Sequence, residues 1–194
     1  LLHVIFRDDK SLLYKKHALD EEHLIRFRFG EPLPRKPELA DMHSSAQHLV
    51  ISDRIKKAMQ AMQLKDVQYL PATMKNPKTD EVFSGYSALH IHNMINCLDL
   101  KKSKFDTLYG KNDNIVSIDK LIFNNEVLDK IPLEERLVFA LGEERLEMFF
   151  HATVVEKIIA LKPTGIMFFP LAKWRDSLPF EMAAMEYIMT PRED

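Results

Sequence analysis

The stretch that decides the fold is residues 49–72, which read LVISDRIKKAMQAMQLKDVQYLPA. The apolar run 49–51 predicts a strand. Ser52 is a typical helix N-cap, because its hydroxyl can accept a hydrogen bond from an unpaired backbone N–H. The next apolar residues recur at the i, i+3, i+4, i+7 spacing of an amphipathic helix, and they are Ile55, Ala58, Met59 and Met62. A second apolar run, 67–70, predicts a strand that ends at Pro71. The helix face of this strand–helix–strand unit must cover a sheet.

A similar pattern returns 99 residues later, in residues 148–171, MFFHATVVEKIIALKPTGIMFFPL. The two copies align without a gap, and eleven columns are apolar in both. The second copy predicts a helix with Val154, Ile158 and Leu161 on its apolar face, then a strand at 166–169 that ends at Pro170. The alignment indicates a weak internal repeat. Chance similarity stays the alternative, because any two strand–helix–strand units share such a pattern.

Further runs predict more strands and hairpins. Residues 24–29 alternate between apolar and arginine side chains, which is the period of a half-buried strand. The Pro-rich residues 30–45 predict a surface loop. The remaining predictions are an extended segment at 89–98, a strand at 115–123, a turn at Asn124-Asn125 with a return strand at 127–128, a hairpin of 137–141 with 146–150, and an amphipathic helix at 181–189.

These elements predict an α+β fold, with a mixed β-sheet, hairpins, and two or more helices packed mainly on one face. We expect one globular unit. Within it, residues 1–45 form N-terminal strands and a Pro-rich connector, residues 46–174 form the α+β core, and residues 175–194 form a C-terminal helical extension.

The composition excludes several classes of protein. Hydrophobic residues at 46% and charged residues at 29% are ordinary for a globular domain and exclude a disordered chain or a collagen. The net charge of -2 shows no basic excess for direct nucleic-acid binding. The single cysteine, Cys97, excludes an internal disulfide and a multi-cysteine zinc site. No apolar run is long enough to span a membrane and no signal peptide is visible, so we expect a cytoplasmic protein.

Five stretches between residues 49 and 174 resemble a family of bacterial immunity proteins, which are encoded beside polymorphic or secreted toxins. They are LVISDRIKKAM, VQYLPATM, YSALHIHNMINCLDLKKSKFD, IVSIDKLIFNNEVL and GIMFFPLAKW. The third is the most specific, with Tyr86, an extended apolar run, then Leu98, Asp99 and Ser103. This chain departs from the family at His90, where Asn is expected, and at Asn96, where a second Asp often stands.

The resemblance implies a non-catalytic protein that binds a cognate toxin or effector protein inside the producing cell and blocks it. Nucleases are among the toxins associated with the family. The resemblance implies no cofactor, and a monomer or a homodimer fits it equally well. Two other classes stay open, a small metal-dependent enzyme and an interaction or regulatory module unrelated to toxins.

His90 and His92 are the most enzyme-like pair. Residues i and i+2 of a strand point to the same face, so two imidazoles could share a metal ion. No spacing rule supplies the further ligands, and a histidine pair on a solvent-facing strand is the alternative. Cys97 lies in an apolar run and is interpreted as a small buried side chain. Asp99, which precedes three lysines, predicts a capped turn, with an anion-binding loop as the alternative.

The acidic side chains are concentrated toward the C-terminus, where residues 131–194 carry 11 acidic and 7 basic residues. Five glutamates flank the predicted hairpin, namely Glu134, Glu135, Glu143, Glu144 and Glu147. They predict a surface that binds a basic toxin, because complementary charge speeds association. A solvated hairpin edge is the alternative. On either interpretation, reversing Glu143 and Glu144 is expected to leave stability nearly unchanged.

Overall fold

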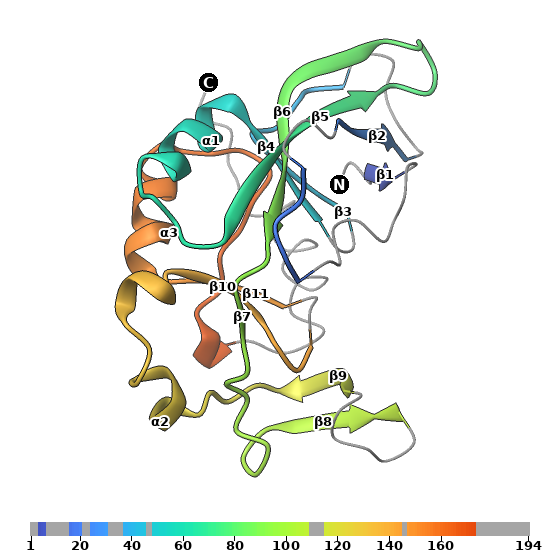
Figure 1. The fold of residues 1–194 in the computed structure, drawn as a ribbon. Coiled ribbons are helices and arrows are strands. Elements are labelled where there is room, and N and C mark those ends of the chain that lie inside the picture. Colours follow the sequence, from blue (N-terminus) through green and yellow to red (C-terminus); the bar gives the residue numbers. More distant parts are fainter. Residues whose placement is uncertain are drawn as a thin grey trace.

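The structure is a computed structural model that describes residues 4–6, 16–20, 24–30, 37–45, 48–108, 115–144 and 147–173. The predicted helix at 181–189, and with it the extension 175–194, lies outside the described residues. A six-stranded sheet forms one end of the molecule, a two-stranded sheet forms the other, and a three-stranded sheet lies between them (Figure 1). No described helix has the length and apolar character needed to cross a membrane.

The six-stranded sheet is mixed and runs in the order β1-β2-β5-β6-β4-β3. Only β2 and β5 pair in parallel, and the other neighbours are antiparallel. The edge strands β1 and β3 contact each other, so the sheet is strongly curled. Its strands are β1 (Val4–Phe6), β2 (Ile25–Phe29), β3 (Met42–Ser45), β4 (His48–Ser52), β5 (Val67–Lys75) and β6 (Val82–Ile91). The predicted α+β class with a mixed sheet is confirmed.

Two smaller sheets complete the described chain. The three-stranded sheet has the order β11-β10-β7, and its β10–β11 hairpin confirms the prediction for 137–150. The two-stranded sheet pairs β8 with β9. The elements are β7 (Met94–Ile95), β8 (Lys104–Thr107), β9 (Ile115–Lys120), α2 (Asn125–Leu128), η3 (Leu133–Glu135), β10 (Val138–Leu141), β11 (Met148–Phe150) and η4 (Leu171–Lys173).

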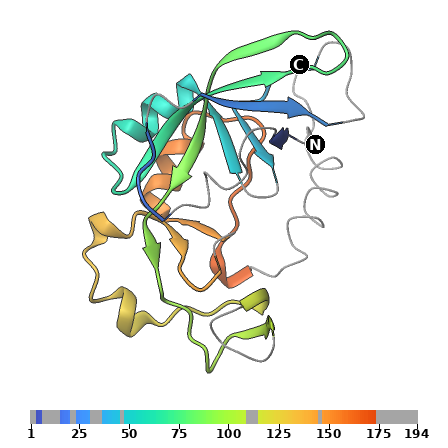
Figure 2. The ribbon, with the colours of Figure 1, turned by 45° about the vertical axis from the view of Figure 1, so that its right-hand side comes forward.

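The helices α1 (Asp53–Gln60) and α3 (Ala152–Ile159) lie side by side on the same side of the six-stranded sheet (Figure 2). Ile55 and Met59 of α1 are fully buried, as are Val154 and Ile158 of α3. Both pairs belong to one apolar core, against which Met62 and Leu161 also pack. The predicted apolar face of each helix is therefore confirmed.

The internal repeat is visible in the local geometry of both units. Each helix begins and ends at positions that differ by 99 residues, and so do the N-caps Ser52 and His151, whose side chains accept bonds from backbone N–H groups. Gln63 and Lys162, three residues beyond the helix ends, both have a positive φ, of 51° and 50°. Shared hydrophobicity alone does not require matching caps and matching left-handed residues, so the two units share a local design.

Two predictions in the N-terminal half are wrong in detail. The predicted loop 30–45 contains β3, a four-residue edge strand that is too short for its alternation to stand out. The strand predicted to end at Pro71 continues to Lys75. At Pro71 only β6 pairs with β5, because β2 joins from Ala72 onward, and a proline is tolerated on such a one-sided stretch.

Two predictions in the C-terminal half are also wrong. The return strand expected at 127–128 is the helix α2, whose first turn is closed by the carbonyl of Asn124, which accepts from the N–H groups of Val127 and Leu128. Residues 166–169 are not in a sheet, although their apolar run predicts a strand. Among the described residues, no bridge or backbone hydrogen bond joins this run to a strand, so it lacks a ladder partner there.

The Asp41 carboxylate joins the two repeat units. Oδ2 accepts bonds from Arg54 on α1 and from the backbone N–H of Thr164, which follows α3, while Oδ1 accepts from the hydroxyl of Ser52. Arg54 also donates to the carbonyl of Leu161, at 2.7 Å. Burial alone would raise the pKa of Asp41, but the bonds from Arg54, Thr164 and Ser52, with the Arg54 charge, lower that pKa to about 2.

We expect Met59→Ala and Ile158→Ala each to lower the free energy of unfolding by about 2–5 kcal/mol, because both side chains are fully buried. Ile159→Ala is the matched control, since Ile159 neighbours Ile158 but is 54% exposed. Urea unfolding of the three variants measures the difference. Equal stability of Ile158→Ala and Ile159→Ala would show that the helix face is wrongly assigned.

Asp41 is also expected to make the free energy of unfolding depend on pH. Because its pKa is lowered on folding, its contribution is present above about pH 4 and is lost as the pH falls toward 2, a loss of roughly 2 kcal/mol. Asp41→Asn should therefore be less stable than wild type at neutral pH, and the gap should narrow over that acidic range. Denaturant titrations at several pH values test this, with the exposed Glu156→Gln as control. A gap that does not change with pH would contradict the role of this carboxylate.

Candidate partner-binding surface

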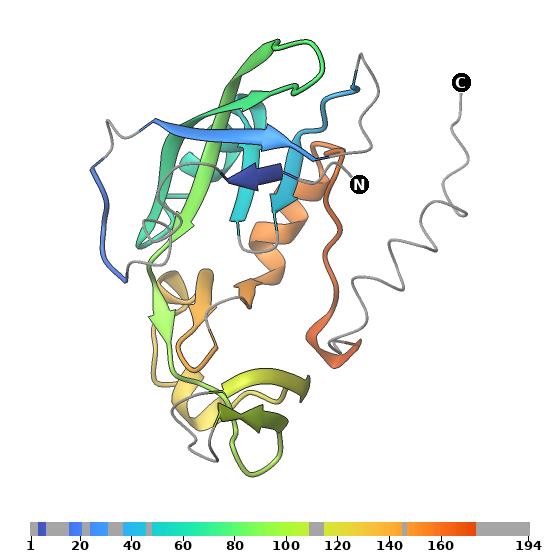
Figure 3. The same ribbon diagram turned by 90° about the vertical axis from the view of Figure 1, so that its right-hand side faces the viewer.

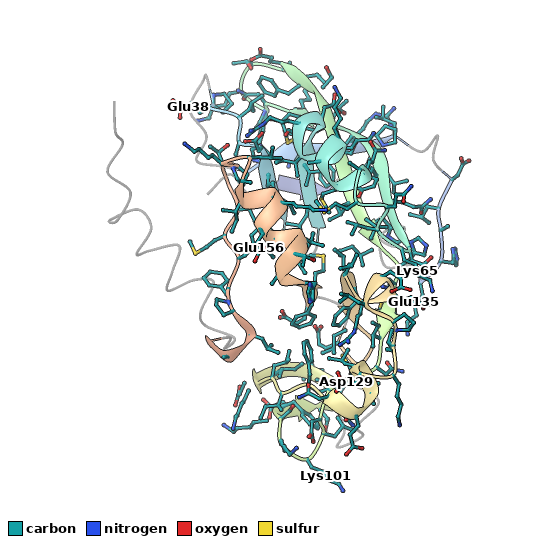
Figure 4. The ribbon with its side chains drawn as sticks, turned by 90° about the vertical axis from the view of Figure 1, so that its left-hand side faces the viewer. Glu38, Lys65, Lys101, Asp129, Glu135 and Glu156 are labelled. Carbon is teal, nitrogen blue, oxygen red and sulfur yellow. The ribbon has the colours of Figure 1, made fainter. Side chains whose placement is uncertain are left out.

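The predicted glutamates lie at the two ends of β10, and the structure does not gather them into one patch. Glu134 and Glu135 both lie on η3, which precedes β10, where Glu134 is exposed and Glu135 is half-buried. Glu135 forms an ion pair with Lys65, which follows α1, and the two side chains point toward each other in Figure 4. The hydrogen bond to Glu135 raises the pKa of Lys65. Glu134 is therefore the exposed member of this end that makes no ion pair with a described residue.

Glu143 turns inward at the other end of β10. Its Oε1 accepts a bond from the backbone N–H of Leu98, at 3.0 Å, and its buried Oε2 has no hydrogen-bond partner among the described residues. Gly142, which precedes Glu143, lets the chain pass close to Asn96, because a Cβ at Gly142 would lie 1.8 Å from Oδ1 of Asn96. Glu143 is thus part of the fold, and the expectation that reversing its charge leaves stability unchanged does not hold.

Glu144 and Glu147 are half-buried in the loop before β11. The four residues of β10 separate them from Glu134 and Glu135. A partner that contacts all of these glutamates must therefore extend along the whole β10–β11 hairpin.

His90 and His92 do share a face, with ring centroids 5.3 Å apart and nearly parallel planes. The prediction that the pair faces solvent is wrong for His90, which is 1% exposed and whose Nε2 lies 3.1 Å from the carbonyl oxygen of His17. His92 is half-buried, with Nε2 3.6 Å from Asp66, and burial lowers its pKa. Within the described ranges, no three His, Cys, Asp or Glu residues are grouped closely enough to hold a metal ion.

His90 instead helps to hold the N-terminal segment on the sheet. Beside it on β5, the Gln68 side chain accepts from the N–H of Leu19 and donates to the carbonyl of the same residue, at 2.7 and 3.0 Å. Leu19 packs against the apolar core on this face. This contact could not be predicted from the sequence, because nothing local to Gln68 signals a partner 49 residues away.

Cys97 and Asp99 confirm their structural interpretations. Cys97 is 1% exposed, and burial, with a smaller effect from Glu143, raises its pKa to about 12. The Asp99 carboxylate accepts from the N–H groups of Lys101 and Lys102, at 3.1 and 3.2 Å, which is the predicted capped turn. Ser103 then bonds through its hydroxyl to both the N–H and the carbonyl of Ile122.

The family-like segment from Tyr86 to Ser103 therefore has a clear structural task. It carries the chain from the large sheet through β7 to the two-stranded sheet and fixes each step by a side-chain bond to the backbone. Tyr86 does the same at its start, by donating to the carbonyl of Ala40 at 3.0 Å.

The fold and this surface define an α+β protein with one strand–helix–strand unit and a related strand–helix unit, and with glutamates at both ends of its central hairpin. A family model described as an immunity protein family, Imm11, matches residues 15–173. The chain belongs to this family. The match begins well before residue 49, where the resemblance in the sequence begins, so it includes the N-terminal strand β2. No curated protein matches the chain.

We expect Glu143→Ala to lower the free energy of unfolding by about 1–3 kcal/mol, because the buried N–H of Leu98 loses its acceptor. Glu143→Gln keeps an acceptor oxygen and should cost less. The exposed Glu134→Ala is the control and should change little. Thermal unfolding compares the three, and a Glu143→Ala variant as stable as Glu134→Ala would exclude a structural role for the carboxylate.

Proposed function

We propose that this chain neutralises a cognate toxin by binding it, without catalysis and in the cytoplasm of the producing cell. The observation that carries the proposal is its membership of an immunity protein family over residues 15–173. The architecture supports it, because the buried histidines and the buried thiol are engaged in packing and main-chain bonds instead of being presented to a substrate.

The proposed toxin is a nuclease, and the proposed contact surface includes Glu134, Glu135, Glu144 and Glu147. The substrate groove of a nuclease must be positive to hold a phosphate backbone. An immunity protein that covers such a groove gains from carboxylates placed where phosphates would lie. Glu143 belongs to the same hairpin, but we assign its carboxylate to Leu98 instead of to the partner.

Neutralisation is tested by co-expressing the chain with the toxin encoded by its neighbouring gene, and by titrating the purified proteins in a calorimeter. The expected results are rescue of growth and a stoichiometric complex. Full toxicity in the presence of the folded chain would overturn the proposal.

The electrostatic part of the proposal predicts an effect on association rate. Glu134→Lys with Glu144→Lys should slow toxin binding at low ionic strength, and the difference from wild type should shrink as salt is added. Glu38→Lys is the control for the single change Glu134→Lys, because it makes the same change of charge at the far end of the molecule (Figure 4). Stopped-flow kinetics measures the rates, and equal slowing by Glu38→Lys would show that only net charge matters.

A further inference from the structure

The first repeat unit has a strand between its two outer segments. In the described part of the chain, the second unit has none. In the first unit β4 and β5 do not pair with each other, because β6 runs antiparallel between them. The equivalent segments of the second unit are β11 and residues 166–169. In the part of the chain that the structure describes, no strand lies between these two segments (Figure 3).

The side chains of residues 166–169 already have the arrangement of a strand in this position. Ile166 and Phe168 pack against the core that α1 and α3 share, as do their equivalents Val67 and Tyr69 on β5. Phe168 meets Phe150 of β11 edge to face, with ring centroids 5.5 Å apart. The two segments therefore cover α3 together, as β4 and β5 cover α1.

Among the described residues, no strand pairs with the backbone of β11 on the side away from β10. Leu141 donates to the carbonyl of Glu147, and His151 donates to the carbonyl of Leu137. Since bonds in an antiparallel ladder alternate, residues 147, 149 and 151 bond to β10. The N–H and C=O groups of Met148 and Phe150 therefore point away from β10, on the side where no described strand pairs with β11.

The apolar side chains here are only partly covered. Met148, Phe149 and Phe150 are half-buried, and so are all four residues of 166–169. Met148 and Phe150 pack on the same core as Ile166 and Phe168, so an added strand could extend that core along the edge of β11. Addition of a strand would satisfy both the backbone groups and the apolar surface.

We propose that the cognate toxin inserts an extended segment between β11 and residues 166–169, antiparallel to β11, at the position that β6 has in the first unit. This inference rests on the proposed function. On β6, Leu89 and Ile91 face the helix core between the flanking strands. The toxin segment is therefore expected to carry two large apolar side chains, two residues apart, that face α3.

An external segment fits better than the undescribed residues 174–194, which follow directly after η4. Their sequence contains Pro179 and Pro191, each of which lacks a backbone donor. Met182, Met185 and Met189 recur at helical spacing, which favours a helix instead of an extended strand. The sequence of the C-terminal stretch is thus a poor match to the middle position of a sheet.

The test compares two substitutions at Met148. Met148→Pro removes an N–H that only an added strand would use, whereas Met148→Ala removes the side chain alone. With a catalytically inactive form of the neighbouring gene's toxin, Met148→Pro should weaken binding at least about tenfold more than Met148→Ala. Equal affinity of the two folded variants would overturn the proposal.

Hydrogen exchange on the wild-type chain tests the same edge without any substitution. The amides of Met148 and Phe150 should exchange freely alone and become protected when the inactive toxin is added. Binding without protection overturns the strand addition but not the proposed function, whereas absence of binding overturns both. Protection in the toxin-free chain also overturns the proposal. If that protection disappears when the chain is truncated after Lys173, the chain's own C-terminus pairs with the edge of β11. If the protection disappears on dilution, a second copy of the chain pairs with the edge.

Discussion

The Asp41 carboxylate is the point on which the arrangement of the two repeat units depends. It lies directly before the edge strand β3 and receives bonds from Ser52 and Arg54 at the start of α1 and from Thr164 after α3. The surroundings leave little room for another arrangement, because a Cβ at Gly165 would lie 2.1 Å from the carbonyl oxygen of Met42. The Asp41 side chain is only 15% exposed, so solvent screens its ion pair with Arg54 less than it screens a pair on an open surface. Each partner also bonds to the main chain, Asp41 to the N–H of Thr164 and Arg54 to the carbonyl of Leu161.

Joining the units in this way gives them one core instead of two. Ile55 and Met59 from the first helix meet Val154 and Ile158 from the second, and β6 and β10 cover the same cluster from the sheet side. The bond from Thr164 to Asp41 also fixes the place where residues 166–169 begin. The position of that segment opposite β11 thus follows from Asp41, although the two segments share no backbone bond.

Local pattern predicted the two longer helices, although it missed the four-residue helix α2. Helical spacing identified both buried helix faces, and Ser52 was correctly placed as an N-cap. The features that were missed depend on partners far away in sequence. Glu143 bonds to Leu98 across 45 residues, His90 meets His17 across 73, and Asp41 meets Thr164 across 123. A glutamate in a polar loop is indistinguishable by composition from one that turns inward, so only the folded chain shows which of the five glutamates is structural.

An open apolar edge is a liability for a protein that must stay dispersed before its partner arrives, since such edges invite pairing with other chains. This chain limits the hazard by length and by flanking residues. β11 has only three residues, Glu147 precedes it, and the run 166–169 lies between Gly165 and Pro170 with Lys162 and Lys173 beyond. Charges and a proline beside a short apolar strand oppose unspecific pairing. They would not oppose the proposed toxin segment, whose length and direction match the edge, so the same features would also select the proposed partner.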